Sequence, residues 1–222
     1  MREKVIVAWS GGKDSALALY EILASGGYEV LKLLTTVTKD YDRISTHGVR
    51  RALLEQQANA LGIPLEITFI SKGASDKEYE NELLKTLKRN LDSGVSSMVF
   101  GDIFLEDVRK YRERILAKVG MNGVFPLWNK DTLRLARKFI NVSFKAIVTS
   151  IDSNVLAKDF VGREYNEQFL SDLPENVDPC GENGEFHSFV YNGPIFHKRV
   201  FFKKGERVLR KNRFYYCDLL PT

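Results

Sequence analysis

The chain has 222 residues, a hydrophobic content of 44% and a net charge of +4. This length suits one large domain or two small ones, and the hydrophobic content supports a buried core. The mild positive charge is not by itself a nucleic-acid signature, and no run approaches the roughly 18 apolar residues that cross a bilayer.

Strands and helices alternate through the first half of the chain. Short apolar or alternating runs predict strands, and apolar residues at helical spacing predict the helices between them. Strand–helix alternation favours an α/β, Rossmann-like parallel sheet covered by helices on both faces. We expect strands at 5–8, 29–37, 65–70, 97–103 and 124–128, and helices starting near 16 and spanning 49–61, 76–92 and 106–119.

The character of the sequence changes after residue 128. We expect a helix at 131–139, a strand at 144–151, a helix that ends near Pro174 and a strand at 186–190. The tail alternates hydrophobic strands with Lys and Arg. The sequence therefore predicts two domains, residues 1–128 and a smaller C-terminal α/β domain of residues 129–222 that packs over the cleft of the first.

The first strand leads into a glycine turn and a helix, in the order Val5 to Ser15. Gly11 and Gly12 allow a sharp turn and a close approach to a ligand. A helix that begins after such a turn directs N–H groups and its positive dipole end at one place, which suits phosphate. Lys13 adds a positive charge, and Asp14 is a candidate magnesium ligand. The structural alternative is a tight turn in an ordinary α/β protein.

Ligands of open parallel sheets bind beyond the carboxyl ends of the strands, where the strand order reverses. This rule brings the loop of residues 10–15 together with Thr35, Thr36 and Val37 and with Gly101 and Asp102. His47 follows a polar loop that could close over a nucleotide, although a single histidine is commonly a surface residue.

A second dense group of reactive side chains lies at residues 178–187. It contains three carboxylates, two glycines, Cys180 and His187. Glu182, Glu185 and His187 are candidates to orient an amine or to accept a proton. A solvated acidic turn before a strand is the structural alternative.

The remaining composition argues against other classes of protein. Cys180 and Cys217 form no Cys-x-x-Cys motif and no disulfide framework, and the three histidines lack zinc-ligand spacing. The N-terminal residues enter a strand with no signal-peptide pattern, so we expect a cytoplasmic protein.

The pattern Ser10 to Ser15 resembles the PP-loop of the N-type ATP pyrophosphatases. Over most of its length the chain resembles the diphthine–ammonia ligase family, in which a PP-loop domain precedes a smaller domain with a Gly-Glu-rich substrate motif. The motif here departs from the family pattern in its order of residues. The matching segments are 10–15, 35–37, His47, 60–64, Gly101-Asp102, 126–128, 160–163 and 181–187.

This resemblance implies an ATP-dependent, AMP-forming ligase that adenylates a carboxylate, releases pyrophosphate and transfers ammonia to form an amide. The implied substrates are ammonium and a carboxylate, which is diphthine on elongation factor 2 in archaea or eukaryotes. ATP and Mg²⁺ are the implied cofactors; a homodimer is possible, whereas nucleic acid and membrane are not expected. The implied ATP-binding residues are Ser10, Gly11, Gly12, Lys13, Asp14, Ser15, Thr35, Thr36, Val37, His47, Gly101 and Asp102; the catalytic residues are Lys13, Asp14, Glu182, Glu185 and His187; the metal ligands are Asp14 and Asp102.

Two other functions fit the same loop. One is a PP-loop enzyme that modifies tRNA by thiolation or by lysidine-type ligation, for which the basic tail of residues 199–213 with its aromatic residues is the relevant feature. The other is a non-catalytic ATP-binding regulator, which would bind ATP without releasing pyrophosphate.

Overall fold

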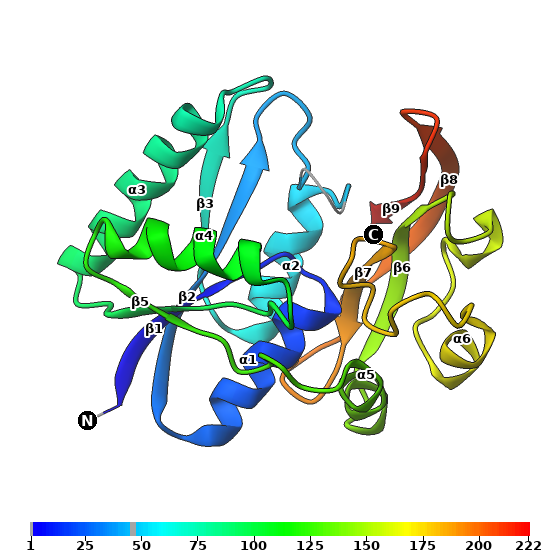
Figure 1. Cartoon of the computed structure of the whole chain (residues 1–222), viewed down its shortest axis with the longest axis horizontal. Helices are drawn as coiled ribbons and strands as arrows, with labels where there is room; N and C mark the ends of the chain where they lie inside the picture. Colours follow the sequence, from blue (N-terminus) through cyan, green and yellow to red (C-terminus); the bar gives the residue numbers. More distant parts are fainter. Residues whose placement is uncertain (1, 45–47) are drawn as a thin grey trace.

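The computed structural model describes residues 2–44 and 48–222, which form two β-sheets with helices around them (Figure 1). The first half of the chain builds a five-stranded sheet and the second half a four-stranded sheet. The elements are β1 (Glu3–Ala8), α1 (Lys13–Ser25), β2 (Tyr28–Thr38), α2 (Arg51–Leu61), β3 (Leu65–Ile70), α3 (Asp76–Asp92), β4 (Ser97–Val99), α4 (Glu106–Ala117), β5 (Asn122–Val124), α5 (Thr132–Asn141), β6 (Lys145–Asp152), η1 (Lys158–Phe160), α6 (Glu167–Asp172), β7 (Phe186–Asn192), β8 (Phe202–Arg210) and β9 (Phe214–Pro221).

The first sheet is parallel and covered by helices on both faces, which confirms the predicted fold class. Side chains of β1 alternate between the two faces. Val5 and Val7 pack in one apolar cluster with α1 and α2, whereas Ile6 packs in a second cluster with α3 and α4. Every β1 side chain in the middle of the strand is therefore buried, as a central parallel strand requires.

The strand order of this sheet is β3-β2-β1-β4-β5. The chain moves from β1 outward to β3, and then crosses back to place β4 on the other side of β1. The order therefore reverses between β1 and β4, and the loops that follow these two strands are neighbours at the carboxyl edge of the sheet. This is the position at which open α/β sheets bind their ligands.

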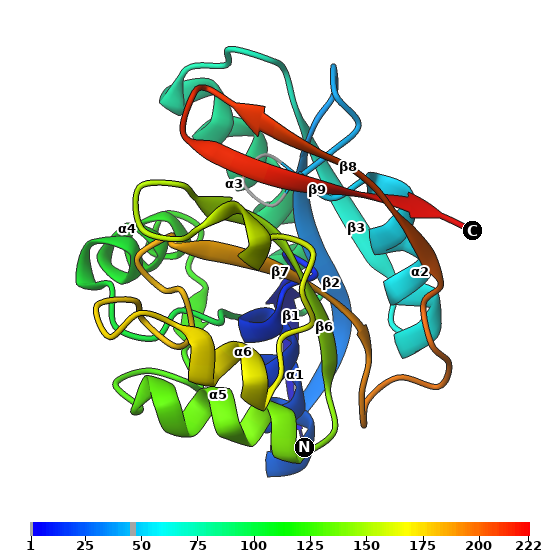
Figure 2. The same ribbon diagram turned by 90° about the vertical axis from the view of Figure 1, so that its right-hand side faces the viewer.

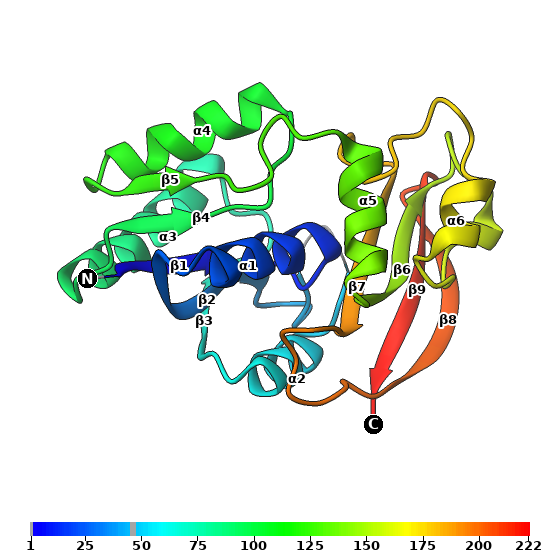
Figure 3. The same ribbon diagram turned by 90° about the horizontal axis from the view of Figure 1, so that it is seen from below.

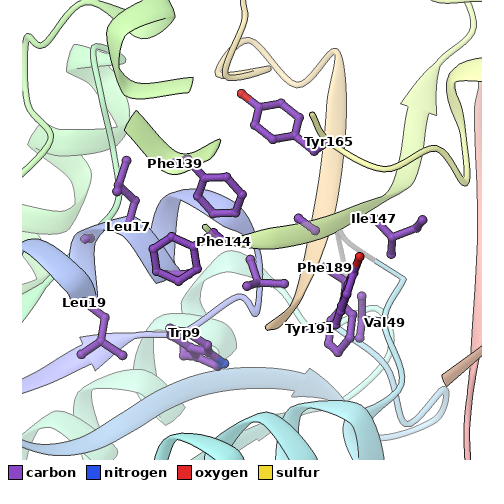
Figure 4. Close-up of a cluster of buried hydrophobic side chains, with 14 of the residues drawn as sticks. Trp9, Leu17, Leu19, Val49, Phe139, Phe144, Ile147, Tyr165, Phe189 and Tyr191 are labelled. Atoms are coloured by element: carbon purple, nitrogen blue, oxygen red, sulfur yellow. The ribbon is translucent and has the colours of Figure 1, made fainter. Parts of the chain in front are cut away.

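The second sheet is antiparallel, with the order β7-β6-β9-β8. Its strand β7 lies against α1, a helix that covers the first sheet (Figure 3). One apolar cluster continues from β1 and α1 into β6, β7 and β9. Figure 4 shows Leu17 of α1 and Trp9 beside Phe144, next to β6 and β7. The two sheets are thus held together by a common core.

The segment between the two halves differs from the prediction. We expected a strand at 124–128, but the last strand of the parallel sheet is β5, which ends at Val124, and a turn follows it. Pro126 cannot donate a ladder hydrogen bond, and the Phe125 carbonyl accepts from the Trp128 amide across the turn. The next element, α5, begins at Thr132.

No helix among residues 2–44 and 48–222 has the length and apolar content to span a membrane. The candidate nucleotide-binding residue His47 lies outside the described residues.

Candidate functional site

A cavity of about 530 Å³ opens at the carboxyl edge of the parallel sheet, between the loops that follow β1 and β4 and the segment before β7. Its lining comes from both halves of the chain. Of the residues singled out in the sequence, the cavity is lined by Ser10, Lys13, Asp14, Ser15, Thr35, Thr36, Gly101, Asp102, Glu182 and His187.

The loop after β1 ends at Gly12, which is the N-cap of α1 and makes no side-chain capping hydrogen bond. A helix N-terminus without a side-chain cap leaves backbone N–H groups that an anion can satisfy. The Ser10 and Ser15 hydroxyls lie 3.2 Å apart beside this helix end. Because the Ser15 hydroxyl donates to the Gly12 carbonyl at 2.9 Å, the donors that a phosphate group can use here are the Ser10 hydroxyl and the amides that follow Lys13.

Two glycines allow other chain segments to approach this loop closely. A Cβ atom on Gly101 would lie 2.7 Å from the carbonyl carbon of Asp14. Gly11 has a φ of +74°, and a Cβ atom there would lie 2.6 Å from the side-chain oxygen of Gln57. The loop is thus fixed from two sides by contacts that a larger residue would prevent.

Strand β7 of the second sheet also contacts the loop. The Ser188 hydroxyl accepts a hydrogen bond from the Lys13 amide at 3.1 Å, and the Val190 amide donates to the Gly11 carbonyl at 2.9 Å. Gln57 of α2 donates to both the Gly11 and the Val190 carbonyls. No sequence pattern indicates these roles of Ser188 and Gln57, because their partners are more than 40 residues away.

Lys13 and Asp14 form a charge pair at the centre of the site. The Lys13 ammonium lies 2.8 Å from a carboxylate oxygen of Asp14, and its side chain is only 5% exposed. It also lies 5.2 Å from the ring centroid of Phe186. Burial acts to lower the pKa of Lys13, but the Asp14 carboxylate outweighs it, so that the pKa is raised and the ammonium stays charged.

Two carboxylates of the 178–187 segment organise the segment itself. One Asp178 oxygen accepts hydrogen bonds from the amides of Cys180 and Glu182. Glu185 is 7% exposed, and one of its oxygens accepts from the Asp178 amide and from the Asn183 side chain. Glu185 does not line the cavity, so the structure places it as a support of the loop rather than beside a ligand.

Glu182 and His187 do face the cavity. One Glu182 oxygen accepts from the Ile103 amide at 2.7 Å, which ties this segment to the loop after β4. Burial, reinforced by the charge of Asp14, raises the pKa of Glu182 to about 7. Burial and then the charge of Lys13 lower the pKa of His187 to about 4, so its imidazole is neutral at physiological pH. Glu182 can therefore exchange a proton near neutral pH.

The end of β2 forms another part of the lining. The strand continues to Thr38 beyond its last pair with β1 at Leu34, so its backbone edge there faces the site. Thr35 and Thr36 line the cavity, whereas Val37 is fully buried in the core and does not. The adjoining lining is largely apolar and can take a flat ring; it includes Leu34, Leu83, Leu87, Met98 and Phe100.

Asp102 is engaged within the protein. Both of its carboxylate oxygens accept hydrogen bonds from the guanidinium of Arg112, at 2.6 and 3.2 Å. The part of the chain that the structure describes contains no group of three or more His, Cys, Asp or Glu residues arranged to hold a metal ion. The metal-binding role of Asp14 and Asp102 stays a prediction. For Asp102 to bind a metal ion, at least one of its oxygens would have to give up, or share, its hydrogen bond from Arg112.

Models of two protein domains match this chain. The diphthamide synthase N-terminal domain matches residues 3–123, and the diphthamide synthase C-terminal domain matches residues 131–219. The chain belongs to the diphthamide synthase family. It is therefore an enzyme of that family, as the resemblance of the PP-loop and the 181–187 segment predicted.

Curated relatives and one solved structure show the extent of the similarity. A diphthine–ammonia ligase of Danio rerio is 26% identical over 94% of this chain and 90% of its own length. One of Schizosaccharomyces pombe is 25% identical over 89% of this chain but only 36% of its own length. A U34-tRNA thiolase structure from Methanococcus maripaludis covers 64% of this chain and 57% of its own, with 16% identity and a TM-score of 0.36.

The two cysteines of this diphthamide synthase family member are both free and buried. The Cys180 thiol donates to the Thr132 carbonyl, and the Cys217 thiol donates to the Asp218 carbonyl. Burial raises the pKa of both thiols, and for Cys180 the rise is large. A thiol that stays protonated is a poor nucleophile, so both cysteines act as apolar packing groups.

Proposed function

We propose that this chain is an ATP-dependent ligase that converts a carboxylate to an amide with ammonia and releases AMP and pyrophosphate. The observation that carries the proposal is the junction of two loops in one cavity: the glycine loop at the start of α1 and the 178–188 segment before β7. The hydrogen bonds from Lys13 to Ser188 and from Ile103 to Glu182 hold them together. The names of the curated relatives support this reaction.

The site fits ATP in three respects. The N-terminus of α1, with the Ser10 hydroxyl, offers donors to the phosphates. The apolar lining beside Thr35 and Thr36 suits the base, which the open backbone edge of β2 can recognise by hydrogen bonds. Asp14 lines the cavity and can ligate Mg²⁺, which prefers one or two carboxylates together with phosphate oxygens.

The chemistry proceeds in two displacements, the first at the α-phosphorus of ATP and the second at the acyl carbon of the substrate. A carboxylate oxygen bonds to the α-phosphorus of ATP as pyrophosphate leaves, and the nitrogen of ammonia then bonds to the acyl carbon as AMP leaves. Lys13 offsets negative charge near the phosphates. Glu182 accepts a proton from the nitrogen, because its pKa of about 7 leaves much of it ionised at neutral pH. His187 stays neutral and orients the amine.

We further propose that the carboxylate belongs to diphthine on elongation factor 2. The relatives are named for diphthine, and their similarity extends over both halves of this chain. A substrate on a translation factor also places the reaction in the cytoplasm. If the organism does not make diphthine, another protein or small-molecule carboxylate takes this place.

Product analysis of ATP turnover tests the proposed function. The full chain is incubated with Mg²⁺, ATP, ammonium and diphthine-bearing elongation factor 2, and AMP, ADP, pyrophosphate and phosphate are separated. We expect AMP and pyrophosphate in equal amounts, lost in Asp14→Ala and retained in Asp92→Ala, an exposed aspartate at the end of α3.

Each of the other outcomes selects an alternative. ADP and phosphate would contradict adenylation. Turnover that depends on tRNA rather than on a carboxylate would favour the tRNA-modifying alternative. ATP binding with no product from any acceptor would favour a regulator.

A further inference from the structure

The positive charge of this chain is concentrated in one hairpin. The segment of residues 198–213, which contains β8 and the turn to β9, has eight basic residues and one acidic residue, a net charge of +7. The whole chain carries only +4, so the remainder carries −3. The basic residues are Lys198, Arg199, Lys203, Lys204, Arg207, Arg210, Lys211 and Arg213.

These charges are directed to solvent. All eight basic residues are exposed. Of these eight side chains, only that of Arg213 forms an ion pair with a carboxylate in the described part of the chain, that of Asp152. Among the described residues, the other seven charges have no ion-pair partner, and those on β8 project from both faces of the strand, because successive side chains alternate. They produce a positive potential around the hairpin that extends over about a Debye length.

The hairpin also offers a free strand edge. β8 is the last strand in the order β7-β6-β9-β8, and Figures 1 and 2 show the hairpin projecting at the margin of the second sheet. Lysines on an edge strand also discourage edge-to-edge aggregation. That role does not account for Lys198, Arg199, Lys211 and Arg213, which lie outside β8.

One face of the hairpin is attached to the margin of the cavity. Asp218 of β9 accepts hydrogen bonds from Arg43 and Arg50, on the segment between β2 and α2. Ile44 of the same segment lines the cavity. A macromolecule bound to the hairpin near Asp218 therefore lies beside the segment that brings Ile44 to the cavity.

We propose that the β8–β9 hairpin binds an acidic face of the protein that carries the substrate carboxylate. The identity of that protein rests on the proposed function, whereas the basic surface does not. Exposed apolar side chains accompany the charges: Phe201 is 62% exposed, Leu209 45% and Leu220 38%. Phe201 is able to stack on a base, but the two leucines are aliphatic and are not, and a free edge can pair with a strand of a partner, so the surface fits a protein better than RNA.

Charge reversal in the hairpin tests this proposal. Binding of the full chain to diphthine-bearing elongation factor 2 is measured at 50, 150 and 300 mM salt for the wild type and for Lys203→Glu/Lys204→Glu. The matched control is Lys88→Glu/Lys145→Glu, which makes the same charge change at exposed residues on α3 and β6. A single unmodified tRNA serves as the competing probe, and thermal unfolding shows that all three chains fold.

We expect the hairpin variant to bind the factor about tenfold more weakly at 50 mM salt, with a smaller difference at 300 mM, and to raise KM for the factor at unchanged kcat. The control should behave as the wild type. Equal binding by the wild type and the hairpin variant, or no binding of the factor by the wild type, would overturn the proposal. So would a loss confined to tRNA binding, which would assign the hairpin to nucleic acid.

The same data separate this proposal from the proposed function. Hairpin-dependent, salt-sensitive binding of the factor without AMP formation would support the docking surface and contradict the ligase reaction. AMP formation with equal kinetics in the wild type, the hairpin variant and the control variant would support the ligase reaction and contradict the docking surface.

Discussion

Asp218→Asn tests whether a charge cluster joins the second sheet to the margin of the cavity. Asp218 lies on β9 and accepts hydrogen bonds from Arg43 at 2.8 Å and from Arg50 at 2.6 and 3.2 Å. Its side chain is 22% exposed. The substitution keeps one oxygen acceptor and the side-chain volume but removes the negative charge between two guanidinium groups.

The magnitude follows from the pKa of Asp218. Burial alone would raise this pKa, but hydrogen bonds from Arg50 and Arg43 outweigh it and lower the pKa from 3.8 to about 2. Such a difference corresponds to about 2.5 kcal/mol of folding free energy at neutral pH. Because the side chain is partly exposed, solvent screening reduces the expected loss in Asp218→Asn to about 1–2 kcal/mol.

The contribution of Asp218 to the free energy of unfolding should fall as the pH falls. A carboxyl group whose pKa is lower in the folded chain stabilises the fold above its unfolded pKa, and that contribution is lost as the pH falls toward the folded pKa. About half of the contribution of Asp218 should therefore disappear between pH 7 and pH 3.

Urea unfolding at both pH values measures this effect. The difference in unfolding free energy between the wild type and Asp218→Asn should shrink on acidification. Asp172→Asn is the control, because Asp172 pairs with Arg163 on the exposed surface of α6. An equal difference at pH 7 and pH 3 would refute the role of the charge, and a loss of equal size in the control would show that the effect is not specific to the cluster.

Three further predictions concern the site. Gly101→Ala should raise KM for ATP about tenfold, since its Cβ atom would meet the Asp14 backbone, whereas Gly27→Ala, with open space around it, should not. Gln57→Leu should lower the free energy of unfolding by about 2–4 kcal/mol, measured in urea. The substitution leaves the Gly11 and Val190 carbonyls and the Trp9 indole N–H without their buried partner. An unchanged urea midpoint would contradict this. The kcat/KM for ammonium should rise with pH through about pH 7 as Glu182 loses its proton. Glu182→Gln should abolish this rise of kcat/KM with pH. If the rise persists in the variant, another group is responsible for it.

Much of the fold could be predicted because the first half of the chain carries strong local patterns. The apolar run of β1 and the helical spacing of α3 are readable without tertiary information, and both elements lie where they were expected. The strand predicted at 124–128 was wrong, since the end of a short strand depends on which backbone groups find partners. Pro126 was the signal against it.

From the amino-acid sequence alone, the glycine loop after β1, the end of β2 and the loop after β4 could be expected to meet at one edge, because parallel strands put their carboxyl ends together and the loop residues can be read in order. Which carboxylates of the 178–187 segment face that edge depends on how the two sheets pack. Glu182 lines the cavity, whereas Glu185 holds its own loop. Residues three positions apart in an irregular loop have no fixed relation in space, so their directions depend on Gly181, whose φ is +64°, and on the contacts of β7 with α1. Those contacts form only when the second sheet packs against the first.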